Sequence, residues 1–110
     1  MQAFYSIQRL GNEVSATSPI PIELADVYSR IFPFVKEDKE YFGLIDTNGT
    51  TLQAMYYCEE DLYWFEVPRP DLEGSYGCYL NFDQAADLIK TLENTFPQKG
   101  FEGFEFNSWK

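Results

Sequence analysis

The dipeptide Asn48-Gly49 constrains the fold of this chain more than any other local feature. It separates two stretches rich in apolar residues, 41–47 and 50–58. A tight hairpin turn needs positive φ angles, which Asn and Gly adopt readily. The sequence therefore predicts a β-hairpin, and a two-residue turn would pair Thr47 with Thr50, Ile45 with Leu52, Gly43 with Ala54 and Tyr41 with Tyr56 on one face.

Four more stretches alternate apolar and polar residues and are predicted to be strands, at 4–8, 62–67, 75–82 and 101–106. Gly11-Asn12 predicts a turn after the first of them. If Glu60-Asp61 is a two-residue loop, Tyr56 pairs with Phe65, whereas a four-residue loop would change that register.

Two stretches have the apolar spacing of helices. The first starts near Ile22, with Pro21 at or near its first turn, and Pro33 ends it. Asn81 or Asp83 can cap the second, and Asn81 has capping-box spacing with Gln84. Pro97 and Gly100 end this helix. Its apolar stripe consists of Ala85, Leu88, Ile89, Leu92 and Phe96.

We expect the order β–α–β–β–β–α–β, an α+β fold in which helices pack on a twisted, mostly antiparallel sheet. This order has five strands, one fewer than the six stretches named above. The 110 residues form a single domain, 1–110, which is large enough to bury roughly two-thirds of the surface of its unfolded chain. A hydrophobic content of 45% is typical of a globular domain rather than an acidic disordered tail.

The net charge of −10 favours a basic partner, or alternatively serves only to keep the protein soluble. Nucleic acid backbones and anionic membranes bind clustered Lys and Arg, so we expect neither as a partner. No apolar run is long enough to cross a membrane, and no secretory signal is visible. We therefore expect a cytoplasmic protein, in which Cys58 and Cys78 are reduced, buried thiols.

The sequence offers few groups for catalysis. It has no histidine, which is the usual base for a serine or cysteine nucleophile. Two cysteines without a CxxC spacing do not predict zinc, and no glycine-rich phosphate loop is present. We therefore expect a protein that is not an enzyme and that carries no cofactor and no metal.

The predicted sheet has one densely apolar face, which takes the second helix, and one mixed face. Aromatic residues rimmed by charge are typical of a protein-binding surface. Alternatively, the first helix covers the mixed face as a second layer of core. The candidate partner-binding residues are Tyr57, Trp64 and Glu66 on the mixed face, with Glu59, Glu60, Asp61, Asp71 and Glu73 in acidic loops at its ends.

Residues 41–96 contain the stretch Phe42-Gly43-Leu44-Ile45-Asp46-Thr47-Asn48-Gly49-Thr50-Thr51-Leu52-Gln53, followed by an aromatic and acidic hairpin and an amphipathic helix. In this layout, the middle of the chain resembles the small immunity proteins of bacterial toxin systems. The resemblance implies a bacterial, non-enzymatic inhibitor that caps the active site of a toxin, often with acidic residues against a basic cleft. It assigns no individual contact residue.

The leading functional hypothesis is therefore an acidic inhibitor of the immunity type, which binds a basic protein such as a toxin or nuclease. Electrostatic steering would make that association fast and sensitive to salt. Two alternatives stay open. One is a regulatory module that binds a small molecule on its aromatic sheet, and the other is a subunit that self-associates through the strand at 101–106 or through the mixed face.

Overall fold

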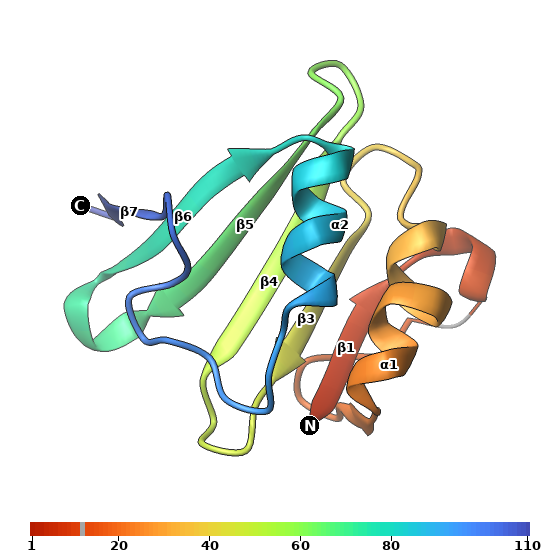
Figure 1. Cartoon of the computed structure of the whole chain (residues 1–110), viewed down its shortest axis with the longest axis horizontal. Helices are drawn as coiled ribbons and strands as arrows, with labels where there is room; N and C mark the ends of the chain where they lie inside the picture. The colour runs from red at the N-terminus through yellow and green to blue at the C-terminus, as the bar shows by residue number, and fades with distance from the viewer. Residues whose placement is uncertain (12) are drawn as a thin grey trace.

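The structure, a computed structural model, describes residues 1–11 and 13–110. They fold around one sheet of seven strands in the order β2-β1-β3-β4-β5-β6-β7, and every neighbouring pair is antiparallel (Figure 1). The strands are β1 Gln2–Ser6, β2 Ile20–Pro21, β3 Tyr41–Ile45, β4 Thr51–Tyr57, β5 Leu62–Arg69, β6 Gly74–Leu80 and β7 Glu105–Ser108.

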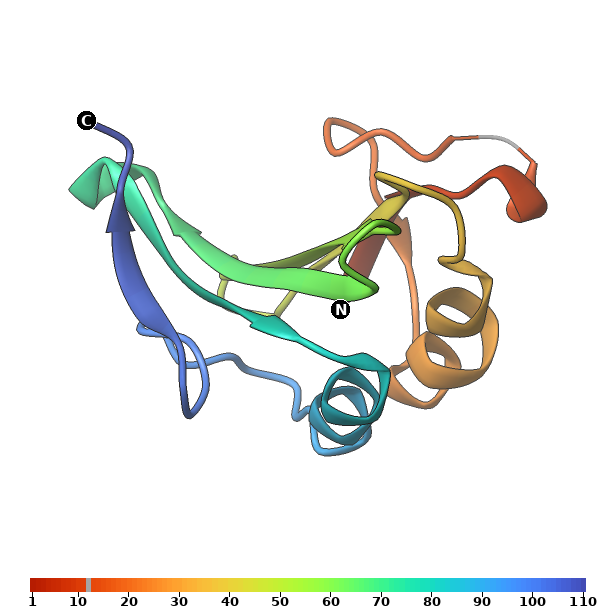
Figure 2. The same cartoon turned by 90° about the horizontal axis from the view of Figure 1, so that it is seen from above.

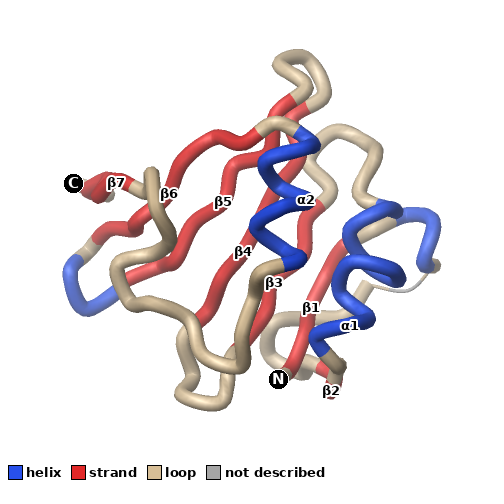
Figure 3. The backbone as a smooth tube through the Cα atoms, viewed as in Figure 1, coloured by secondary structure: helices blue, strands red, loops and turns tan. Residues whose placement is uncertain are grey.

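Two helical segments accompany the sheet. α1, Leu24–Asp26, continues into a π-helical turn, Val27–Ile31, and then into a 3-10 turn, Phe32–Phe34. α2 spans Phe82–Lys90, and a long loop joins it to β7 (Figure 3). Shorter 3-10 turns at Gln8–Leu10 and Pro70–Leu72 lie within loops.

Both helical segments pack on the same face of the sheet (Figure 2). Val27 and Ile31 from the first segment and Ala85 and Ile89 from α2 belong to one buried cluster with the strands. The strand residues of that cluster are Ala3, Phe42, Leu44, Leu52, Ala54, Tyr63, Phe65 and Val67. Neither helical segment lies on the opposite side, named here the open face, so the alternative in which the first helix covers the mixed face is wrong.

The α+β class and the antiparallel sheet are confirmed, but the predicted order of elements has two strands too few. Four strands, β3 to β6, lie between the two helical segments where that order has three, and the order also omits β2. β2 contains only two residues, which pair with Gln2 and Ala3 of β1. One of them is Pro21, which was expected at the start of the first helix and instead precedes α1. A pair this short shows no alternation, so periodicity gives no signal for it.

The predicted register of the β3–β4 hairpin is wrong by one residue. Leu44 pairs with Leu52 and Phe42 pairs with Ala54, so these apolar residues of β3 face the helices. Tyr41, Gly43 and Ile45 consequently lie on the open face. A one-residue slip moves every side chain of a strand to the other face, and burial of Phe42 and Leu44 favours the observed register.

Asp46 explains the longer turn. Its backbone amide donates to the carbonyl of Thr50 at 2.9 Å, which leaves residues 47–49 as a three-residue turn with Gly49 at φ 84°. Its carboxylate Oδ1 accepts hydrogen bonds from the amides of Asn48 and Thr50 at 2.9 and 2.8 Å. A three-residue turn that ends on a left-handed glycine is a common alternative to the two-residue turn.

The β4–β5 hairpin differs from the two-residue prediction by two positions. Tyr56 pairs with Tyr63 and Tyr57 pairs with Leu62, so the loop contains four residues, 58–61. A shift of two keeps each side chain on its face. The predicted placement of Tyr57, Trp64 and Glu66 on one face is therefore confirmed, and Gln53, Met55 and Leu62 share that face.

The helix ends differ from their predicted positions. The capping box of α2 is confirmed, because Asn81 and Gln84 exchange side-chain and backbone hydrogen bonds of 2.9 Å. The helix nevertheless ends at Lys90, and Leu92 and Phe96 are buried beyond it. The first helical segment does not end before Pro33, which its last 3-10 turn accommodates.

The first and last strands also have other bounds than predicted. The first strand is Gln2–Ser6 rather than 4–8, and the last is Glu105–Ser108 rather than 101–106. The last strand does lie at the edge of the sheet. Asn12 of the predicted Gly11-Asn12 turn lies outside the described residues.

Candidate functional site

Aromatic side chains form a row across the open face. Tyr41, Met55, Trp64 and Tyr79 occupy directly paired positions on β3, β4, β5 and β6. The rings of Trp64 and Tyr79 lie 4.9 Å apart between centroids, and Tyr57 meets Tyr79 edge-on at 6.4 Å. Such contacts are favourable aromatic geometries. Tyr79 is 57% exposed, so this row presents ring surface to solvent.

A polar row runs beside the aromatic row. Gly43, Gln53, Glu66 and Gly77 are paired across the same four strands. The Glu66 carboxylate accepts a hydrogen bond from Gln53 Nε2 at 2.7 Å and another from the Trp64 indole Nε1 at 2.9 Å. Glu66 therefore fixes the orientation of both neighbours.

Gly77 allows the indole of Trp64 to lie close against the sheet. A Cβ atom at Gly77 would come within 2.7 Å of Trp64 Cζ2 and within 2.6 Å of the Phe65 carbonyl oxygen. A Cβ at Gly43 would likewise clash with the ring of Phe4. The two glycines thus make room for the rings of Phe4 and Trp64.

A cavity of about 340 Å³ opens on this face. We name it the aromatic cavity; its lining residues are Tyr41, Gln53, Ala54, Met55, Tyr57, Trp64 and Glu66. Burial raises the pKa of Tyr41, and the adjacent Glu13 carboxylate raises it further. Three of the eight predicted partner-binding residues, Tyr57, Trp64 and Glu66, are thus brought together in one cavity.

The charge of the open face is negative. Strand pairing places Glu66 and Glu105 on it. Among the strand residues that the structure describes, no Lys or Arg shares that face, since Arg69 lies on the helix side opposite Gly74. An aromatic surface whose charged strand residues are acidic is electrostatically complementary to a basic partner.

The first acidic loop, Glu59, Glu60 and Asp61, lies beyond one end of β4 and β5 (Figure 1). Glu59 and Glu60 are exposed. Asp61 accepts a hydrogen bond from the Tyr56 hydroxyl at 2.7 Å. That bond, with burial, raises the pKa of Tyr56 to about 12.

The second acidic loop lies at the opposite end of β5, about 23 Å away along an extended strand. Asp71 forms an ion pair with Arg69 at 2.7 Å, and this hydrogen bond lowers the pKa of Asp71. Glu73 forms an ion pair with Lys110. Both carboxylates therefore have a cationic neighbour, and they are not brought together with the first loop.

Sequence reasoning missed Tyr41 and Tyr79 as members of the site. The one-residue slip in the β3–β4 hairpin placed Tyr41 on the helix-covered face. Tyr79 alternates with Cys78 and Leu80, so strand periodicity already puts it on the opposite side of β6. Alternation alone could therefore have identified Tyr79, whereas Tyr41 required the correct turn length.

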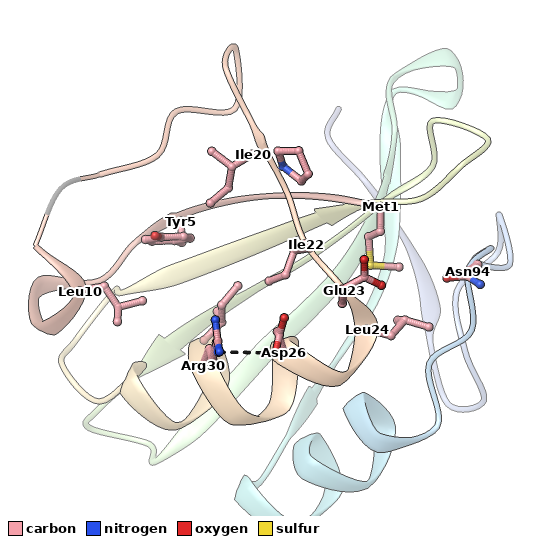
Figure 4. A pocket seen from close by; sticks show the side chains of 12 residues that line it. Met1, Tyr5, Leu10, Ile20, Ile22, Glu23, Leu24, Asp26, Arg30 and Asn94 are labelled. Carbon is pink, nitrogen blue, oxygen red and sulfur yellow. Dashed lines mark ion pairs between the residues drawn. The ribbon is translucent and has the colours of Figure 1, made fainter.

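A larger groove of about 580 Å³ lies on the other side of the molecule, between the N-terminal strands and α1 (Figure 4). Tyr5, Leu10, Ile20 and Ile22 contribute much of its apolar wall, and an ion pair between Arg30 and Asp26 at 3.5 Å lies along it. None of the eight predicted partner-binding residues lines this groove.

Both cysteines carry free thiols, but the prediction that both are buried is wrong. Cys58 is exposed in the β4–β5 loop, and Cys78 is half-buried on β6. Within residues 1–11 and 13–110, no three His, Cys, Asp or Glu side chains lie close enough to hold a metal ion together. No helix in this part of the chain combines the length and apolar character that a membrane crossing requires.

Comparison of the chain with protein-family models, with curated proteins and with solved structures finds no match.

Proposed function

We propose that this protein is a non-enzymatic binding protein that inhibits a basic partner by covering its active site, as immunity proteins do with toxins. The observation that carries the proposal is the placement of both helices on one sheet face. It leaves aromatic residues of four strands uncovered on a face whose charged strand residues are acidic. Large uncovered apolar patches on soluble proteins commonly mark interaction sites.

The proposed partner is a protein with a cationic surface, such as a nuclease whose substrate is anionic. A net charge of −10 steers such a partner toward the protein over several ångströms of solvent. Glu59 and Glu60, which project from the loop at one end of the strands, would meet the partner first. Salt screens interactions of this kind, so higher ionic strength should slow association.

The proposal places the protein in the cytoplasm, where its free thiols would stay reduced. It also assigns no catalytic role, because the chain has no histidine that could serve as a general base. The inhibitory effect would come from steric and electrostatic occlusion alone.

For the test, the wild-type protein and the double variant Glu59→Lys/Glu60→Lys are each immobilised on an affinity matrix. Lysate of the source organism is then passed over each matrix at low salt. We expect the wild type to retain one basic protein in stoichiometric amount and to release it at high salt. The double variant should retain at least about tenfold less of that protein, because its loop repels a cationic surface.

A matched control is Glu93→Lys/Glu102→Lys, which changes the net charge equally at exposed positions in and near the loop between α2 and β7. This control should capture the same protein as the wild type. Equal capture by Glu59→Lys/Glu60→Lys, or equal loss in both variants, would contradict binding at the proposed surface. Far-UV circular dichroism checks that each variant is folded.

A second candidate function, a module that binds a small molecule, is favoured by the groove beside α1. Its volume of about 580 Å³ is within the range of ligand pockets, and its wall combines apolar side chains with polar ones such as Glu23 and Asn94. The variant Ile22→Asp places a charge in that wall. Saturable binding of a small apolar fluorophore that Ile22→Asp abolishes would support this candidate, and unchanged binding would contradict it.

A further inference from the structure

We propose that the aromatic cavity binds an arginine side chain of the protein partner. The inference rests on the proposed function and deepens it, because it names the group that the open face recognises. It depends on three features of the cavity: its rings, its carboxylate and the rigidity of both.

The rings supply the first feature. Tyr41, Tyr57 and Trp64 line the cavity together with Met55. The face of an aromatic ring attracts a cation within about 6 Å of its centroid, and indole attracts it most strongly. A cavity of about 340 Å³ has room for a guanidinium group and part of its alkyl chain.

The carboxylate of Glu66 supplies the second feature. It accepts two hydrogen bonds, from Gln53 and Trp64, and an ionised carboxylate has about four acceptor sites. The ion pairs found among the described residues involve Asp26, Asp71 and Glu73 and do not include Glu66. The negative charge of the cavity therefore has no cation beside it, although two acceptor positions remain for one.

Rigidity is the third feature. The hydrogen bonds of 2.7 and 2.9 Å fix the carboxylate between Gln53 and Trp64 before any ligand arrives. Packing of Trp64 against Tyr79 at 4.9 Å, and its close approach to Gly77, hold the indole in place. A preorganised site loses little entropy when it binds.

Arginine fits these features better than lysine. Its guanidinium is planar, so one group can stack on an aromatic face and donate several hydrogen bonds to a carboxylate. It is also less strongly hydrated than an ammonium group, which lowers the cost of entering a half-buried cavity. Neutral ligands such as sugars would leave the charge of Glu66 uncompensated.

The experiment titrates the whole protein with N-acetyl-L-arginine methylamide and follows the indole N–H resonance of Trp64 by ¹⁵N NMR. The variant Trp109→Phe, at the exposed C-terminal end, serves as the background in which Trp64 is the remaining tryptophan. We expect a saturable shift with a dissociation constant in the millimolar range. The citrulline analogue, which is nearly the same shape but neutral, should bind about tenfold more weakly.

Two variants test the cavity itself. Glu66→Gln keeps the shape of the side chain and removes its charge, and Tyr57→Leu removes a ring without touching Glu66. Both should weaken binding of the arginine amide about tenfold or more, whereas Glu102→Gln, an exposed carboxylate outside the cavity, should leave it unchanged. The dispersion of the amide resonances reports whether each variant is folded.

Absence of a saturable shift, equal binding of the citrulline amide, or full binding by Glu66→Gln would overturn the proposal. Equal or tighter binding of N-acetyl-L-lysine methylamide would overturn the choice of arginine. These results are separable from the proposed function. If the partner is captured by the wild type and lost from Glu59→Lys/Glu60→Lys while the arginine amide does not bind, the arginine inference fails and the proposed function stands.

Discussion

At the scale of single residues, two buried carboxylates organise backbone that no strand or helix satisfies. Asp46 is 5% exposed and joins the β3–β4 turn to the loop after α2. Glu40 is 8% exposed and accepts hydrogen bonds from the amides of Gln8, Lys36 and Glu37. Leaving a buried amide without its acceptor lowers the free energy of unfolding. Each carboxylate therefore stabilises the backbone segments whose amides it binds as well as its own position.

We expect Asp46→Ala to lower the free energy of unfolding by about 2–4 kcal/mol, because the amides of Asn48, Thr50 and Phe96 lose a charged acceptor. Urea denaturation followed by tryptophan fluorescence measures this. Asp87→Ala, an exposed position on α2, is the control and should change stability by no more than about 0.5 kcal/mol. Equal effects of the two substitutions would show that Asp46 has no special role.

The buried carboxylate of Glu40 should make the free energy of unfolding depend on pH. Burial raises its pKa, but the amides of Glu37, Gln8 and Lys36 lower it more, so the folded value lies below 4.5. A lowered pKa in the folded state contributes stability above the unfolded pKa, and this contribution is lost as the pH falls through the folded value. The stability difference between the wild type and Glu40→Gln should therefore be constant above about pH 5.5 and shrink below about pH 4.5.

Denaturation curves of both proteins between neutral pH and about pH 3 give this difference. Asp87→Asn, an exposed carboxylate on α2, provides the matched comparison. A difference between wild type and Glu40→Gln that stays constant down to the lowest pH would show that Glu40 does not stabilise the protein as an anion.

At the scale of elements, the sequence predicted those features that depend on residues close together in the chain. The capping box at Asn81 and the face shared by β4 and β5 both follow from nearby sequence. The β3–β4 register did not, because Asp46 prefers a three-residue turn and its second oxygen accepts from the amide of Phe96, 50 positions later. A contact so distant in sequence has no local signature.

The capping box of α2 should contribute measurably to the stability of the protein. Asn81→Ala should destabilise the protein by about 1 kcal/mol, since Asn81 Oδ1 accepts from the amide of Gln84 at 2.9 Å. Asn81→Asp, which keeps an acceptor at the start of α2, should retain the stability of the wild type. Thermal unfolding of the three proteins distinguishes these outcomes, and an unaltered melting temperature for Asn81→Ala would contradict the role of the cap.

At the scale of the whole molecule, the sequence predicted part of the open face and the apolar face that α2 covers, but it left open which face the first helix covers. Tyr57, Trp64 and Glu66 were placed together by alternation. The separation of the two acidic loops by the length of β5 follows from the same strands, yet the pairing of Asp71 with Arg69 and of Glu73 with Lys110 required coordinates. The position of α1 depends on how its short, irregular helical turns pack, which apolar spacing does not specify.

The binding role of the open face is tested most directly by photo-crosslinking from two exposed aromatic positions. Tyr79 lies on the open face and is 57% exposed, whereas Phe82, at the start of α2, is 51% exposed and stacks on Phe32 of the helix side. Each is replaced in turn by p-benzoylphenylalanine, and the protein is irradiated in lysate of the source organism. We predict one basic protein crosslinked from position 79 and none from position 82. Crosslinking of the same protein from position 82 alone, or of no protein from position 79, would contradict the assignment of the open face as the binding surface.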